Sequence, residues 1–151
     1  MDDLLGWQNT LWGMTQDEVI EVVNSRTLVE CAPVDYGTLY CPMHIENTKV
    51  GPYFFEVSFL FSKKNHLLER VTVRHTDTPG TPMQVPFSVA MKVLTERFGP
   101  PAREGTSNTF IWQFPTTTIK LDMFDIQQVL SAVGIIFFPT AYYHATDIPA
   151  F

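Results

Sequence analysis

Residues 53–61 alternate apolar and mixed side chains in a pattern that predicts a β-strand with one buried face. The odd positions carry Tyr, Phe, Val, Phe and Phe, whereas the even positions carry Phe, Glu, Ser and Leu. Residues 67–75 repeat the alternation, with Val71 and Val73 on one face and arginine and threonine on the other. Because a short polar turn at 63–65 separates the two segments, we expect an antiparallel hairpin that needs a cover over its apolar face.

The register of this hairpin follows from requiring like faces to meet. A three-residue turn places Val57 opposite Val71 and lets Asn65 take the left-handed conformation. The same register puts Glu69 beside Phe59 on the apolar face. We therefore expect that end of the hairpin to be open to water.

Two helices are predicted. The sequence T-Q-D-E at residues 15–18 is a capping box, and the valines and isoleucine of residues 19–23 form a short apolar stripe after it. Residues 86–98 carry an apolar stripe at helical spacing. Pro86 suits the first turn, and Gly99 followed by two prolines ends the helix.

Prolines, glycines and changes in the apolar pattern indicate the structure of the remaining segments. Residues 28–46 are interrupted by Pro33 and Pro42, which predicts short strands or edge strands. Residues 76–86 are rich in threonine, proline and glycine and resemble a linker. Three strand candidates close the chain, at residues 108–114, 117–124 and 129–138, and residues 123–128 are also compatible with the start of a short helix.

This order of elements predicts one α+β domain spanning residues 1–151. Helices on one face of an antiparallel sheet are the natural way to bury the apolar faces of such a chain. Each half has one helix followed by about three strands, which suggests two diverged pseudo-repeats at about 7–76 and 85–138.

Charge and hydropathy restrict the partners. The net charge is −6, and the ten lysines and arginines are scattered, so we expect no nucleic-acid binding. No stretch reaches the roughly 20 apolar residues of a membrane helix, so we expect no membrane insertion. The N-terminus lacks the pattern of a signal peptide. This predicts a cytoplasmic protein if the chain is full length, and a periplasmic one if a signal peptide was trimmed.

Cys31 and Cys41 are the two cysteines of the chain, and their spacing fits no zinc pattern. One interpretation is a pair of buried thiols, which we favour slightly from the residues alone. The other is a disulfide between adjacent strands, which requires an oxidising compartment.

The motif W-G-M-T at residues 12–15, followed by Val19, resembles the opening of small bacterial modules of the SmpA/OmlA type. It is similar also to the tandem-repeat β-lactamase inhibitory proteins. Cys31, the pair Tyr36-Gly37, Cys41 and the triplet Gly51-Pro52-Tyr53 follow in the order seen in those inhibitors. The resemblance lies mainly in the first half, and the second half is similar to uncharacterised bacterial proteins. It implies a protein-binding or envelope-associated scaffold with a disulfide between the two cysteines.

Catalytic and metal-binding patterns are sparse. His44 with Glu46, and His75 with Asp77, share strand faces, but neither pair brings the third ligand that a metal site needs. Cys41 and His44 are three residues apart, which places them on opposite faces of a strand rather than side by side. We therefore expect no enzyme and no cofactor. A hydrolase with dispersed residues remains an alternative, which a cleft holding His44 or His75 would favour.

The sheet face away from the helices is the best candidate site. Aromatic and arginine side chains surrounded by both charge signs are typical of protein interfaces. The residues predicted to share this face are Phe54, Glu56, Ser58, Arg70, Thr72, Arg74, Lys120 and Asp122. They favour a non-enzymatic protein-binding module of the inhibitor, immunity or scaffold type, although a plain solvated sheet face shows the same pattern.

A second functional class is a carrier of a small apolar ligand. Its cavity is expected between the helices and the sheet, in a void lined by Met91, Phe98 and Met123.

Overall fold

The computed structural model describes residues 3–23, 28–31, 36–77, 82–106, 109–126 and 130–142. Its elements, in chain order, are α1 (Gln16–Val22), β1 (Leu28–Glu30), β2 (Leu39–Val50), β3 (Tyr53–Ser62), β4 (Leu68–Asp77), α2 (Gln84–Phe98), β5 (Arg103–Thr106), β6 (Thr109–Gln113), β7 (Thr117–Ile126), β8 (Leu130–Pro139) and the 3-10 turn η1 (Thr140–Tyr142). The expected linker at 76–86 is therefore shorter, and its residues 78–81 lie outside the described part. Tyr143 and Phe151 of the tail also lie outside it.

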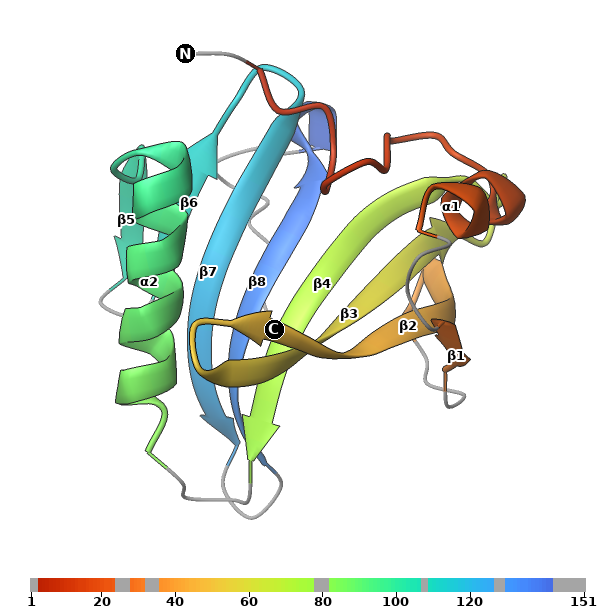
Figure 1. Ribbon diagram of the computed structural model, residues 1–151. Coiled ribbons are helices and arrows are strands. Elements are labelled where there is room, and N and C mark those ends of the chain that lie inside the picture. Colours follow the sequence, from red (N-terminus) through yellow and green to blue (C-terminus); the bar gives the residue numbers. More distant parts are fainter. Residues whose placement is uncertain are drawn as a thin grey trace.

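All strands pair antiparallel in one sheet with the order β1-β2-β3-β4-β8-β7-β6-β5. The predicted α+β class is confirmed, with both helices on one face of the sheet (Figure 1). Each half contributes one helix and four described strands, one more than expected. The two sets of strands mirror each other about the junction of β4 and β8, which are the last strands of their halves.

The predicted start of α1 and the predicted end of α2 are confirmed, whereas α2 begins two residues before the predicted start at residue 86. In α1 the Thr15 hydroxyl accepts from the Glu18 amide and the Glu18 carboxylate accepts from the Thr15 amide, which completes the capping box. Pro86 lies in the first turn of α2, where a missing N–H costs nothing. Gly99 ends α2 with a φ of 85°, which is accessible to glycine without strain.

Strand β2 corrects the expectation of short strands around Pro42, because it runs for twelve residues. The ladder between β2 and β3 is irregular between Tyr40 and Met43, where β2 holds one extra residue. Pro42 lies in this bulge, so the strand continues past a residue that has no N–H to donate.

The predicted register of the β3–β4 hairpin is wrong by two residues. Phe59 pairs with Val71 and Val57 pairs with Val73. One residue of this shift comes from the turn, because Phe61 pairs with Leu68 and the turn is one residue longer than expected. The other comes from Glu69, an extra residue that β4 holds after this first pair. This bulge removes the carboxylate from the apolar face, which the regular register could not do. The left-handed residue of the turn is His66, with a φ of 60°, rather than Asn65.

The sheet bends so strongly that the β2–β3 hairpin crosses its helix-bearing face and reaches α2 (Figure 1). A Cβ atom on Gly51, at the hairpin tip, would lie 2.4 Å from Val89 Cγ1 on α2, so glycine permits this contact. The segment before α1 runs along the upper edge of the sheet, where Asp3 accepts hydrogen bonds from Thr116 and the Trp12 indole donates to Thr117. The enclosed side chains form one core from both halves.

Residues 123–126 continue β7, so the short helix considered there is not formed in the described part of that segment. Neither helix of the described residues is long and apolar enough to cross a membrane.

Candidate functional site

The face opposite the helices brings together side chains from β3, β4, β8 and β7. In one row across the sheet, Glu56 pairs with Arg74, Arg74 with Gly134, and Gly134 with Asp122. Gly134 has no side chain, so this row holds no side chain between Arg74 and Asp122. The neighbouring row pairs Thr72 with Ile136.

A cavity of about 140 Å³ opens along these rows, and we call it the Arg70 cavity. Four of the predicted residues, Arg70, Thr72, Arg74 and Asp122, lie in its wall. Its other lining residues are Tyr36, Leu60, Val73, Gly134 and Ile136. The cavity therefore combines two guanidinium groups, one carboxylate and apolar surface, which is a composition that can hold a charged side chain.

Arg70 is the unusual group in this cavity. It is half-buried, and burial lowers the pKa of its guanidinium, while the adjacent Glu69 carboxylate acts in the opposite direction. Among the described residues, no acceptor lies within hydrogen-bond or ion-pair distance of its guanidinium. A partly desolvated cation without a partner is unfavourable, because water no longer compensates its charge fully.

Lys120 differs from its predicted place on an open surface, because its side chain is buried, with 5% of the residue exposed. Its Nζ lies 3.6 Å from Asp122 Oδ2. Burial lowers the pKa of Lys120, the Asp122 carboxylate raises it, and the Arg70 charge adds to the lowering. Asp122 also accepts a 2.9 Å hydrogen bond from the Thr109 hydroxyl, so its carboxylate is largely engaged.

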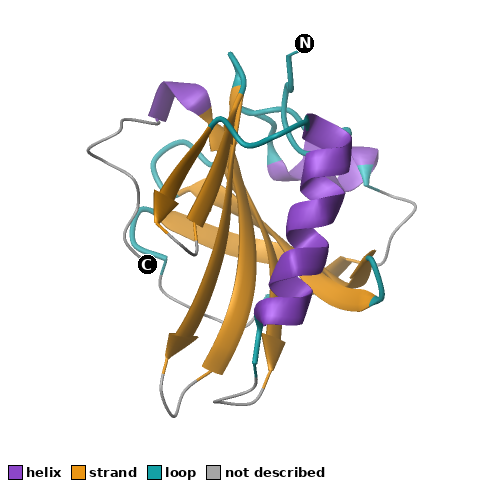
Figure 2. Cartoon of the chain, turned by 90° about the vertical axis from the view of Figure 1, so that its left-hand side faces the viewer, coloured by secondary structure: helices purple, strands orange, loops and turns teal. Residues whose placement is uncertain are grey.

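The expectation of an open face is wrong at its centre. Leu60, Ile136 and Phe138 are buried, although they point away from the helices. These apolar side chains are covered because exposing them to water is unfavourable. Tyr36 and Leu60 both line the Arg70 cavity. Figure 2 shows the turn η1 on the side of the sheet opposite α2, where the Thr140 hydroxyl lies 2.8 Å from that of Thr118.

Tyr36 is a site residue that sequence reasoning missed. It lies in the connection between β1 and β2 and makes an isolated bridge to Leu39. Strand and helix periodicity assigns no face to such a residue, and the resemblance that includes the pair Tyr36-Gly37 implied no binding role for it.

Besides Lys120, three predicted residues do not line the Arg70 cavity. Phe54 is 53% exposed on the β2–β3 hairpin, where Lys49 Nζ lies 5.7 Å from its ring centre. Glu56 pairs with Arg74 across the strands, and Ser58 pairs with Thr72. Glu56 and Ser58 therefore lie next to residues of the cavity wall without lining the cavity themselves.

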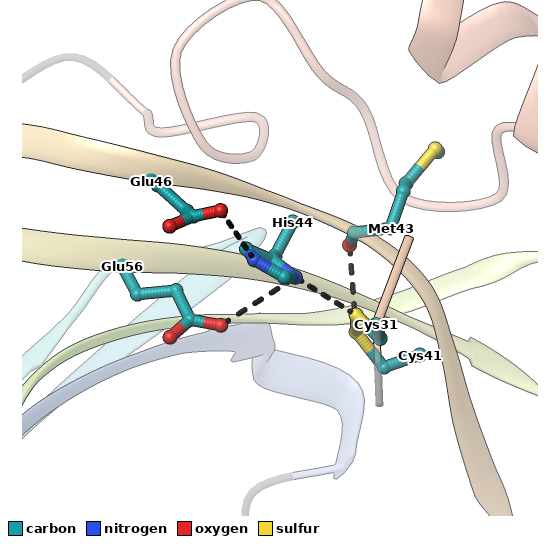
Figure 3. The surroundings of a disulfide bond; sticks show 6 residues. All are labelled: Cys31, Cys41, Met43, His44, Glu46 and Glu56. Atoms are coloured by element: carbon teal, nitrogen blue, oxygen red, sulfur yellow. Dashed lines mark hydrogen bonds and ion pairs between the residues drawn. A yellow bond between two sulfur atoms is a disulfide. The ribbon is translucent and has the colours of Figure 1, made fainter. Parts of the chain in front are cut away.

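Cys31 and Cys41 form a disulfide that joins the end of β1 to β2, with their Cα atoms 6.1 Å apart. This is the second of the two interpretations left open by the sequence. Figure 3 shows His44 beside this disulfide, with its Nδ1 3.4 Å from the Cys31 sulfur. Cys41 therefore carries no thiol in this form, and His44 faces Cys31 rather than acting on a Cys41 nucleophile.

Two carboxylates flank His44. Its Nε2 lies 3.6 Å from Glu46 Oε1 and its Nδ1 lies 3.5 Å from Glu56 Oε1. The predicted proximity of His44 and Glu46 is present, with Glu56 added from β3 (Figure 3). Within the described residues, however, no group of three or more His, Cys, Asp or Glu side chains could hold a metal ion.

His75 lies in β4, with β3 between its strand and the strand of His44, and it has a structural contact. Its Nδ1 lies 2.9 Å from the Phe54 carbonyl oxygen, and its ring packs against Tyr53 and Phe55. His44 and His75 therefore do not share a site.

The void expected for an apolar carrier is not formed by the predicted three residues together. Phe98 lines a cavity between α2 and the sheet, whereas Met91 lines a separate surface groove beside Phe110. Met123 packs against the core.

Comparison with known proteins gives no relative from which a role could be transferred: no family model, no curated protein and no solved structure matches this chain.

Proposed function

We propose that this protein is a non-enzymatic binding module that docks a protein partner on the sheet face around the Arg70 cavity. The observation that carries the proposal is the half-buried Arg70 guanidinium, which has no acceptor among the described residues and lines a cavity about 140 Å³ in volume. A carboxylate from a partner would supply the missing acceptor through a charge-assisted hydrogen bond.

The surroundings of Arg70 fit an interface anchor. Arginine and tyrosine are enriched among the residues that contribute most to protein binding, and Tyr36 lines the same cavity as Arg70. Arg74 is exposed at the rim, where it can steer an acidic partner toward the cavity. Asp122 is already engaged by Lys120 and Thr109, so it repels an incoming carboxylate less than a free aspartate would.

We also propose that the protein works in an oxidising compartment. A disulfide such as Cys31–Cys41 persists in the periplasm or outside the cell and is rare in a reducing cytosol. The disulfide agrees with the resemblance to the β-lactamase inhibitory proteins, whose comparable cysteines are also joined. The disulfide supports a location outside the cytoplasm, and the resemblance supports a role as an inhibitor or scaffold there.

Affinity capture from a lysate of the host, followed by binding measurements on the purified partner, tests the proposal. The Arg70→Gln, Arg74→Gln double variant removes both guanidinium groups. The matched control, Lys64→Gln with Lys92→Gln, removes two exposed cations elsewhere on the chain. We expect the double variant to weaken binding at least about tenfold, as loss of an interface anchor does, and the control to bind as wild type does.

Equal binding by the double variant and the control would overturn the assignment of this face. The absence of any stoichiometric protein partner would overturn the binding-module proposal itself.

A further inference from the structure

A second cavity lies on the opposite side of the sheet, inside the core. It has a volume of about 260 Å³ and lies between the C-terminal half of α2, the tip of the β2–β3 hairpin and the sheet. Val73, Ile135 and Phe137 belong to the sheet side of its lining, and Leu94 and Phe98 to the helix side. The segment before α1 contributes to the lining as well, so the cavity is enclosed by elements from both ends of the chain.

One hydroxyl in this lining has no hydrogen-bond partner among the described residues. The ladder between β2 and β3 is irregular between Ile45 and Thr48, where β2 carries one extra residue and Asn47 has a φ of 57°. The bulge turns Thr48 onto the same face as its pair Phe55, toward the core. Thr48 Oγ1 is buried and makes no hydrogen bond within the described part of the chain. Buried hydroxyls are almost always satisfied, so this atom indicates a missing acceptor or donor.

The charged side chains at this cavity are positive, although the whole chain has a negative net charge. The protein carries a net charge of −6, yet the charged residues lining the cavity are Lys49 and Arg97, and both are cationic. Arg97 follows Val93 by one helical turn on the side of α2 that lines the cavity, and its side chain is exposed. The Cζ atom of Arg97 lies 5.6 Å from the centre of the Phe98 ring. No described carboxylate pairs with Arg97, so an anionic group at the cavity would meet a guanidinium that has no carboxylate partner in the described part of the chain.

We propose that this cavity binds a small amphipathic acid, with its apolar body against Ile135 and Phe137 and with its carboxylate accepting hydrogen bonds from both Arg97 and the Thr48 hydroxyl. Scaling from the roughly 150 Å³ cavity that accommodates one benzene molecule, this volume admits on the order of ten non-hydrogen atoms. Octanoate has this size and charge. The site is separate from the Arg70 cavity, and neither depends on the other.

Calorimetric titration of the intact protein with octanoate, 1-octanol and octylammonium tests the ligand class. We expect octanoate to bind at one site, octanol to bind about tenfold or more weakly because it lacks the carboxylate, and octylammonium to bind most weakly. Methyl NMR should place the octanoate shifts at Val73, Leu94 and Ile135. Equal binding of the three ligands, no octanoate binding, or shifts elsewhere would each overturn the proposal.

Two variants separate a binding role from a structural one. Thr48→Val replaces the unpaired hydroxyl with a methyl of the same shape, so it should raise the Tm of the free protein and weaken octanoate binding by about threefold to tenfold. Arg97→Gln should weaken octanoate but not octanol, and Lys92→Gln on the same helix should change neither. Arg70→Gln should leave octanoate binding unchanged, which keeps this test independent of the proposed protein interface. If Thr48→Val and Arg97→Gln bound octanoate as wild type does, the proposal would fail.

Discussion

Arg70 and Thr48 are both polar residues that lack a hydrogen-bonding partner among the described residues, on opposite faces of one sheet. A chain selected only for stability would replace such groups, since apolar residues of similar shape are often neutral or better. Each lines a cavity, one polar and one apolar. The coincidence of an unsatisfied group with a cavity is the reason for assigning a ligand to both places.

Glu18 provides a prediction about pH at this scale. Hydrogen bonds from the Thr15 amide and hydroxyl hold the pKa of Glu18 below its ordinary value of 4.5. A carboxyl whose folded pKa lies below its unfolded pKa stabilises the fold above the unfolded value, and this contribution is lost as the pH falls through the folded value. We therefore expect wild type to lose stability on acidification below about pH 4.5, and Glu18→Gln to lose less over the same interval.

Urea unfolding at pH 7 and pH 3 measures this difference. Thr15→Ala is the companion variant, and it should lower the free energy of unfolding by about 1 kcal/mol at pH 7 because a helix N-cap is lost. If wild type and Glu18→Gln lost the same free energy of unfolding between pH 7 and pH 3, protonation of Glu18 would not contribute to the acid sensitivity of the fold.

At the scale of elements, bulges contribute to the wrong predictions about the strands β2 and β4. The extra residue Glu69 in β4 shifts the hairpin register, and extra residues near Pro42 and Asn47 let β2 run for twelve residues. Alternation of apolar and polar residues identifies strands and their buried faces. It does not locate a bulge, because a bulge depends on the partner strand and on which side chains would otherwise be buried.

The disulfide should stabilise β1, the edge strand that it joins to β2. Cys31 and Cys41 are ten residues apart, so their link restricts the unfolded chain and should contribute about 2.7 kcal/mol in the loop-entropy model. The Cys31→Ser, Cys41→Ser variant should unfold at a lower temperature, and its β1 amides should exchange faster while those of β7 and β8 do not. If the oxidised and the reduced wild-type protein unfolded at the same temperature, this expectation would be contradicted.

At the scale of the whole molecule, the two halves meet along β4 and β8, which pair over seven residues. The core cluster contains side chains of both halves, including Phe59 and Val71 from the first and Trp112 and Phe137 from the second. Two halves that share one core and one sheet should unfold together, because neither can bury its apolar face alone.

This predicts that fragments 1–81 and 82–151 are each unfolded in isolation and recover the native signal when mixed. Near-UV circular dichroism of the buried Trp7 and Trp112 reports the recovery, and the intact chain should show one transition by near-UV and far-UV signals. A cooperative transition in either isolated fragment would show instead that the halves are independent domains.

The residues alone determined the α+β class, both helices with their ends, most of the strands and the sheet face that carries Arg70 and Asp122. These features follow from local periodicity, capping and turn chemistry, which act over a few neighbouring residues. Only the tertiary structure decided the register of the hairpin, the burial of Lys120, the place of Tyr36 and the two cavities. Those depend on contacts between residues far apart in the chain, where bulges, strand order and the bend of the sheet set which side chains meet.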